Sequence, residues 1–125
     1  MEILENPITI GQLQTIAEAL YGDMVKAVAD VSAGRIAIDA ELHSDLEQLL
    51  LSNGSEQENL WGFNLYPGAD EEDFVEFDSL INIRPRQNNM SRSIDSENIK
   101  KEILEIVNRY ISKSCVSGKS SGRII

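Results

Sequence analysis

Hydrophobic residues recur at helical spacing near both ends of the chain. Between residues 7 and 22, apolar side chains fall on one face at positions i, i+3, i+4 and i+7. Thr9 and Gln12 form a capping box just before that stripe. Residues 94–111 show the same periodicity, and Asp95 is their expected N-cap. Both segments are therefore predicted to be amphipathic helices.

Between these two segments, hydrophobic and polar residues alternate, as they do in half-buried strands. Two strands are predicted within residues 23–42, joined by a tight turn in which Gly34 supplies a positive φ. A third strand is predicted within residues 59–66. The longest strand is predicted over residues 73–85, and Pro85 ends it because proline cannot donate a hydrogen bond to a sheet.

Residues 44–53 leave two interpretations open. Ser44 and Glu47 form a capping box before helically spaced leucines, which predicts a short helix. The pair Asn53-Gly54 is also a hairpin signal, and in that case the same stretch is a strand. Either way, the order of elements predicts a two-layer α+β fold. We expect a four-stranded, mostly antiparallel sheet with an N-terminal and a C-terminal helix packed on one face.

The composition is that of one ordinary globular domain, with 125 residues of which 42% are hydrophobic and 26% charged. We expect the domain to occupy residues 1–112 and the Ser- and Gly-rich residues 113–125 to form a flexible tail. Because Cys115 is the one cysteine, no disulfide framework is expected, and a reducing cytoplasm is the simplest compartment to expect. No secretory signal or membrane-spanning stretch is apparent.

The charge changes sign along the chain. Residues 1–81 contain 17 acidic and 2 basic residues, whereas residues 82–125 contain 4 acidic and 9 basic residues. The net charge of −10 argues against nucleic acid and anionic membranes as partners, because both repel an acidic protein. A local basic patch is still compatible with one small anion.

The first candidate site lies where the charge changes sign, in the segment NIRPRQNNMSR at residues 82–92. Its arginines could present bidentate donors to a phosphate or a carboxylate, and its amides and hydroxyls add neutral donors. The predicted anion-binding residues are Asn82, Arg84, Arg86, Ser91 and Arg92. Two other roles stay open for the arginines, namely neutralising the protein's own carboxylates and contacting a partner protein.

The second candidate site is a group of carboxylates around His43, the one histidine. Asp39, Glu41 and His43 are spaced by two, so a strand continuing through them places all three on the polar face of the sheet. Asp78 falls on the same face of the predicted long strand. These four residues could hold a divalent metal or supply a general acid and base. Alternating acidic residues also make an ordinary solvated surface.

Three stretches of sequence resemble a known family. They are GDMVKAVADVSAGRIAIDAELHSD, LLLSNGSEQENLWGFNLYP and VEFDSLINIRPRQNNMSRSI. Together they resemble a small bacterial family of uncharacterised proteins, a domain of unknown function, over about residues 3–111. The resemblance covers both candidate sites. It implies no activity, because none is established for that family.

Two functions therefore remain open from the sequence. The first is a non-enzymatic module that binds a small anionic ligand or a partner protein through the arginine-containing segment 82–92 and the polar face of the sheet. The second is a metal-dependent hydrolase or phosphoryl-handling enzyme, in which the group around His43 holds the cation and Arg84 or Arg92 holds a phosphate. The sequence leaves open whether the chain is an enzyme and whether it forms a homo-oligomer.

Overall fold

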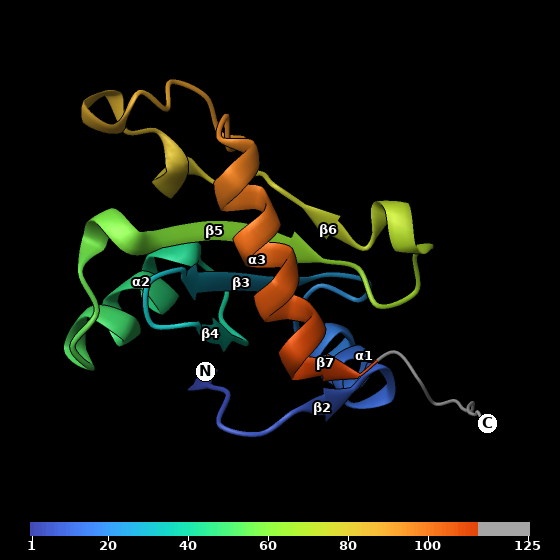
Figure 1. Ribbon diagram of the computed structural model, residues 1–125. Coiled ribbons are helices and arrows are strands. Elements are labelled where there is room, and N and C mark those ends of the chain that lie inside the picture. Colours follow the sequence, from blue (N-terminus) through green and yellow to red (C-terminus); the bar gives the residue numbers. More distant parts are fainter. Residues whose placement is uncertain (113–125) are drawn as a thin grey trace.

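A five-stranded antiparallel sheet organises the computed structural model (Figure 1). The structure describes residues 1–112, so the tail predicted at residues 113–125 lies outside the described residues. The strands run in the order β1–β4–β3–β5–β6. Their bounds are Glu2–Ile3 for β1, Arg35–Ile38 for β4, Val25–Asp30 for β3, Leu60–Leu65 for β5 and Val75–Glu76 for β6. A second, parallel pair joins β2 (Ile8–Thr9) to β7 (Ile111–Ser112).

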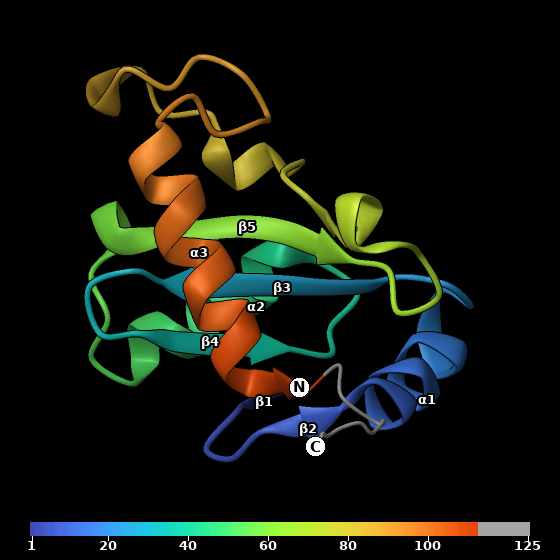
Figure 2. The ribbon, with the colours of Figure 1, turned by 45° about the vertical axis from the view of Figure 1, so that its right-hand side comes forward.

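Three helices cover the two faces of the sheet. They are α1 (Ile10–Leu20), α2 (His43–Ser52) and α3 (Glu97–Tyr110). Figures 1 and 2 show α3 crossing one face and α2 lying behind the other. α1 and α3 share the larger core, which includes Trp61 and Phe63, whereas α2 packs Leu46 and Leu50 against Val28 on the opposite face. None of the helices within residues 1–112 is long and apolar enough to cross a membrane.

The α+β class and the mostly antiparallel sheet are confirmed, but the predicted layering is wrong in part. The third helix adds a layer on the face that was expected to be free of helices, because its leucines form a second apolar cluster. The fifth strand, β1, was missed. At two residues, Glu2 and Ile3, it is too short to show any alternation.

Local signals decide where α1 and α3 begin. Thr9 forms the predicted capping box with Gln12, and its hydroxyl accepts from the Gln12 backbone N–H at 3.1 Å. The last helix is capped by Ser96 rather than the predicted Asp95. The Asp95 backbone N–H donates instead to the side chain of Asn89, and the Ser96 hydroxyl accepts from Ile99 at 3.2 Å. Of the two interpretations for residues 44–53, the structure has the helix, but the capping box predicted for Ser44 and Glu47 is wrong, because the helix begins at His43 and its N-cap, Leu42, makes no side-chain hydrogen bond.

The strand predicted over residues 73–85 is wrong beyond Glu76. Only Val75 and Glu76 pair with β5. The chain then crosses close over Gly62 of β5, where an added Cβ would lie 2.7 Å from both Cβ and Oγ of Ser79. Ser79 caps a 3-10 turn at Leu80–Asn82, so the remaining hydrophobic residues follow a turn instead of a ladder.

The crossing over Gly62 gives a test of this fold. We expect Gly62→Ala to lower the free energy of unfolding by about 1–3 kcal/mol, because the new methyl group overpacks the contact with Ser79. Chemical denaturation measures the change. Gly68→Ala is the matched control, since nothing lies within 4 Å of a Cβ built there. Equal stability of the two variants would contradict the close crossing.

Candidate functional site

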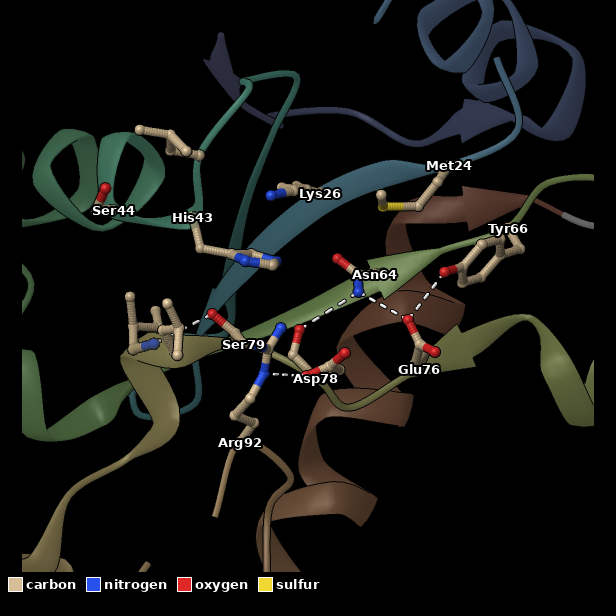
Figure 3. Close-up of a pocket in the computed structure, with 13 residues that line it drawn as sticks. Met24, Lys26, His43, Ser44, Asn64, Tyr66, Glu76, Asp78, Ser79 and Arg92 are labelled. Carbon is tan, nitrogen blue, oxygen red and sulfur yellow. Dashed lines mark hydrogen bonds and ion pairs between the residues drawn. The ribbon is translucent and has the colours of Figure 1, made fainter. Parts of the chain in front are cut away.

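A cavity of about 560 Å³ opens on the face of the sheet that α2 covers only in part (Figure 3). Its floor is one cross-strand row, in which Lys26 of β3 pairs with Asn64 of β5 and Asn64 pairs with Glu76 of β6. We call this hollow the row cavity. Its polar lining consists of Lys26, His43, Ser44, Asn64, Tyr66, Glu76, Asp78, Ser79 and Arg92.

His43 enters the row cavity as the first residue of α2, and its side chain is buried. Its Nε2 lies 2.9 Å from the backbone oxygen of Phe63. Because a carbonyl oxygen can only accept, Nε2 carries the proton and Nδ1 is left as an acceptor in the neutral ring.

The electrostatic surroundings keep the His43 ring neutral. Burial lowers the pKa of His43 below its usual value of 6.5, since a charged ring would lose its hydration. The positive charge of Lys26 lowers it further. Three effects oppose that shift without reversing it, namely the hydrogen bond to the Phe63 backbone, the hydrogen bond that the charged ring would make to the Asn64 side chain, and the negative charge of Asp78.

Asn64 is the centre of a hydrogen-bond network on the cavity floor. Its Nδ2 donates to Glu76 Oε1 at 2.9 Å and to the Asp78 backbone oxygen at 3.3 Å. Tyr66 donates its hydroxyl to the same Glu76 oxygen at 2.9 Å. Burial, followed by this hydrogen bond, raises the pKa of Tyr66 to about 12, so the phenol stays a donor at neutral pH.

The row cavity has two cations, and they differ in their pairing. Within residues 1–112, the Lys26 ammonium makes no ion pair and lies 5.4 Å from the centre of the Tyr21 ring. Arg92 binds Asp78 through Nε at 2.6 Å. Both partners of that pair are largely solvated, so it contributes about 1 kcal/mol or less to stability.

Two of the predicted anion-binding residues are used to complete the outer edge of β5. The fully buried side chain of Asn82 accepts from the Gly62 N–H at 2.8 Å and donates to the Gly62 carbonyl at 2.9 Å, as a neighbouring strand would. Arg84 donates to the carbonyl of Leu60 and pairs with Glu47 of α2 at 3.6 Å. Its guanidinium also lies 4.7 Å from the centre of the Trp61 ring.

The other three predicted anion-binding residues lie in different places and do not form one site. Arg86 is exposed and borders a second, smaller cavity of about 400 Å³ that Arg84 also lines. Ser91 is also exposed, and its hydroxyl lies 3.5 Å from Asp95 Oδ1. Arg92 is the member of the predicted set that lines the row cavity, and Figure 3 shows its guanidinium there beside Asp78.

The predicted metal-binding residues are not brought together as one group. The strand expected to carry three of them ends at Ile38, because Asp39 has a φ of 75° and turns the chain. Asp39 lies 3.4 Å from the N-terminal ammonium, whereas His43 and Asp78 line the row cavity. Glu41 is exposed. Within residues 1–112, no three His, Cys, Asp or Glu side chains are placed to hold a metal ion.

Sequence reasoning did not select three of the residues that define the row cavity. Lys26 and Asn64 fit the alternating polar face of the predicted strands, but nothing in the sequence shows that they occupy the same cross-strand row. Tyr66 follows directly after β5 and carries no sequence signal of its own. The missing information is the strand register, which the backbone pairing supplies.

Comparison with known proteins gives one match. A family model described as "Protein of unknown function (DUF5674)" matches residues 2–110. No curated protein and no solved structure matches the chain.

Replacing Asn82 tests whether a side chain completes the edge of β5. We expect Asn82→Ala to lower the free energy of unfolding by roughly 2–4 kcal/mol, because both backbone groups of Gly62 lose a buried partner. Urea denaturation measures the loss. Asn98→Ala removes only an exposed side-chain hydrogen bond to Glu102, so it should change stability by about 0.5 kcal/mol or less.

The single histidine makes the row cavity directly measurable by NMR. We expect the ring of His43 to titrate below pH 6.5, with Lys26→Met raising its pKa and Asp78→Asn lowering it. Below about pH 6.5 the unfolded chain binds more protons than the folded one, so the free energy of unfolding contributed by His43 falls as the pH falls. A folded-state pKa at or above 6.5 would contradict this description.

Proposed function

The chain belongs to the DUF5674 family of proteins of unknown function, and we propose that it is a binding module whose row cavity takes a small anionic ligand. We also place it in a bacterial cytoplasm, which suits the single cysteine and the sequence resemblance. The observation that carries the binding proposal is the unpaired ammonium of Lys26 inside a polar cavity.

An unpaired cation beside two carboxylates needs a reason. Glu76 and Asp78 line the same cavity as Lys26, yet their hydrogen bonds go to Asn64, Tyr66 and Arg92. Removing Lys26 from water without a partner raises its free energy, and an anion beside it would lower that cost. The half-buried position of Lys26 on the cavity floor suits that role.

Arg92 supplies the second contact to the anion. It uses Nε to bind Asp78, and within residues 1–112 its two terminal nitrogens make no hydrogen bond. These nitrogens form the part of a guanidinium that binds carboxylates and phosphates with two parallel hydrogen bonds. The loop arginine predicted for this purpose therefore acts together with a lysine from the middle of the sheet.

The size and charge of the row cavity suit a small ligand. A volume near 560 Å³ lies within the range of small-molecule sites. The cavity carries two cations and two carboxylates, so with a neutral His43 it has no net charge, although the whole chain carries −10. It is thus a place on an acidic protein where an anion is not repelled at short range.

Inorganic phosphate is a suitable first probe for the proposed site. We expect saturating phosphate to raise the melting temperature of the full chain by about 3–6 °C, since a ligand that binds only the folded state stabilises it. Lys26→Met and Arg92→Met should each reduce the shift by more than half. Differential scanning fluorimetry at constant ionic strength measures these shifts.

Arg86→Met is the matched control, because it removes the same charge from the same loop outside the row cavity. It should leave the phosphate-induced shift unchanged. If Arg86→Met loses the phosphate-induced shift and Arg92→Met retains it, the anion binds in the cavity beside Arg84 and Arg86 instead of the row cavity. The proposed function fails if phosphate, sulfate and small carboxylates all leave the protein unchanged.

A further inference from the structure

We propose that the row cavity selects an oxyanion that brings its own hydrogen-bond donor, such as the hydroxyl of hydrogen phosphate, and that Asn64 is the residue that selects it. This inference rests on the proposed anion-binding function. It adds the chemical class of the ligand and a residue that distinguishes one anion from another.

The orientation of the Asn64 amide is fixed by its neighbours. Nδ2 faces Glu76 Oε1 and the Asp78 backbone oxygen, and both of these atoms can only accept. Reversing the amide would place three oxygens together, so Oδ1 must point the other way. Figure 3 shows this oxygen directed toward the side of the cavity where His43 and Lys26 lie.

Asn64 Oδ1 is a buried acceptor without a donor. The residue is only 6% exposed, and within residues 1–112 no group donates to this oxygen while His43 is neutral, because only the protonated ring of His43 would donate to it. Buried polar atoms in folded proteins are normally hydrogen-bonded, because an unpaired one has lost water without replacement. An unsatisfied acceptor aimed into a cavity is what a ligand hydroxyl or N–H would complete.

Other groups of the lining can also accept a hydrogen bond from a ligand, although Glu76 and Asp78 already have donors within the protein. The carboxylates of Glu76 and Asp78 accept hydrogen bonds, and Nδ1 of a neutral His43 is an acceptor as well. The cavity therefore offers two cations to the negative charge of a ligand, and several hydrogen-bond acceptors to a hydroxyl or N–H group of the same ligand. A fully ionised anion satisfies the cations but is repelled by the acceptors.

A comparison of phosphate with sulfate distinguishes the requirement for negative charge from the requirement for a hydrogen-bond donor. The two anions have nearly the same size and shape, but at neutral pH phosphate keeps at least one hydroxyl and sulfate keeps none. Sites that hydrogen-bond a hydroxyl reject analogues that lack it, because their polar groups are left unpaired. The row cavity should therefore bind phosphate and discriminate against sulfate.

The donor could belong to the oxyanion itself or to a neighbouring carbon. Glycolate and acetate test the second source, because both are carboxylates and only glycolate carries a hydroxyl. Titration of the full chain with phosphate, sulfate, glycolate and acetate at equal ionic strength, followed through the ring protons of His43, reports binding inside the row cavity. Calorimetry on the same samples gives the affinities.

We expect the donor-bearing member of at least one pair to bind roughly 10- to 100-fold more tightly than its partner, in keeping with the cost of an unpaired buried acceptor. Whichever pair discriminates identifies the source of the donor. Equal affinities within both pairs would overturn the selection by Asn64 while leaving anion binding intact. Absence of binding by all four probes would remove the proposed function itself.

Two variants distinguish the selection of one anion over another from the overall attraction of anions to the cavity. Asn64→Leu keeps the branched shape of the side chain without its polar atoms and should reduce the affinity ratio of the discriminating pair to about one. Lys26→Met should weaken every probe and preserve the ratio, whereas Lys101→Met, which removes an exposed charge from α3, should change neither. Because the comparison of phosphate with sulfate uses the unaltered protein, the inference can be tested even if Asn64→Leu does not fold.

Discussion

The hydrogen bonds between the Asn82 side chain and Gly62 are the constraint on which the rest of the structure depends. β6 pairs with only two residues of β5, so the remainder of that strand would present unpaired backbone groups to a buried environment. One amide supplies both a donor and an acceptor there, and Arg84 satisfies the next carbonyl. Because side chains take the place of a neighbouring strand, the chain can leave the sheet after Glu76 and return to place Arg92 at the row cavity.

Much of the fold could be predicted because it depends on local signals. The terminal helices follow from their periodicity, and the turn at Gly34 follows from the need for a positive φ, which is 70° in the structure. The end of the sheet could not be predicted in the same way. Alternating hydrophobic residues after Glu76 fit a strand or a wrapping segment equally well, and the choice depends on the close approach to Gly62.

The candidate site shows the same division between local and distant information. Polar residues such as Asn82 and Asn89 have the composition of a ligand-binding loop, yet both are buried, Asn82 binding the backbone of β5 and Asn89 the loop's own backbone. Lys26 and Asn64 become a site only through the register of three strands. A single positive φ at Asp39 is enough to separate residues whose spacing suggested one metal group.

The pairing of β2 with β7 has a consequence for how the protein is made. Ile8 lies beside Ile111, so a segment synthesised among the first residues waits for a partner roughly one hundred residues later. On the ribosome the central strands can assemble while the N-terminal segment is still without its neighbour. Contacts of such high sequence separation form slowly and leave apolar surface open meanwhile. The pairing of β2 with β7 is therefore the last part of the fold that can form during synthesis of the domain.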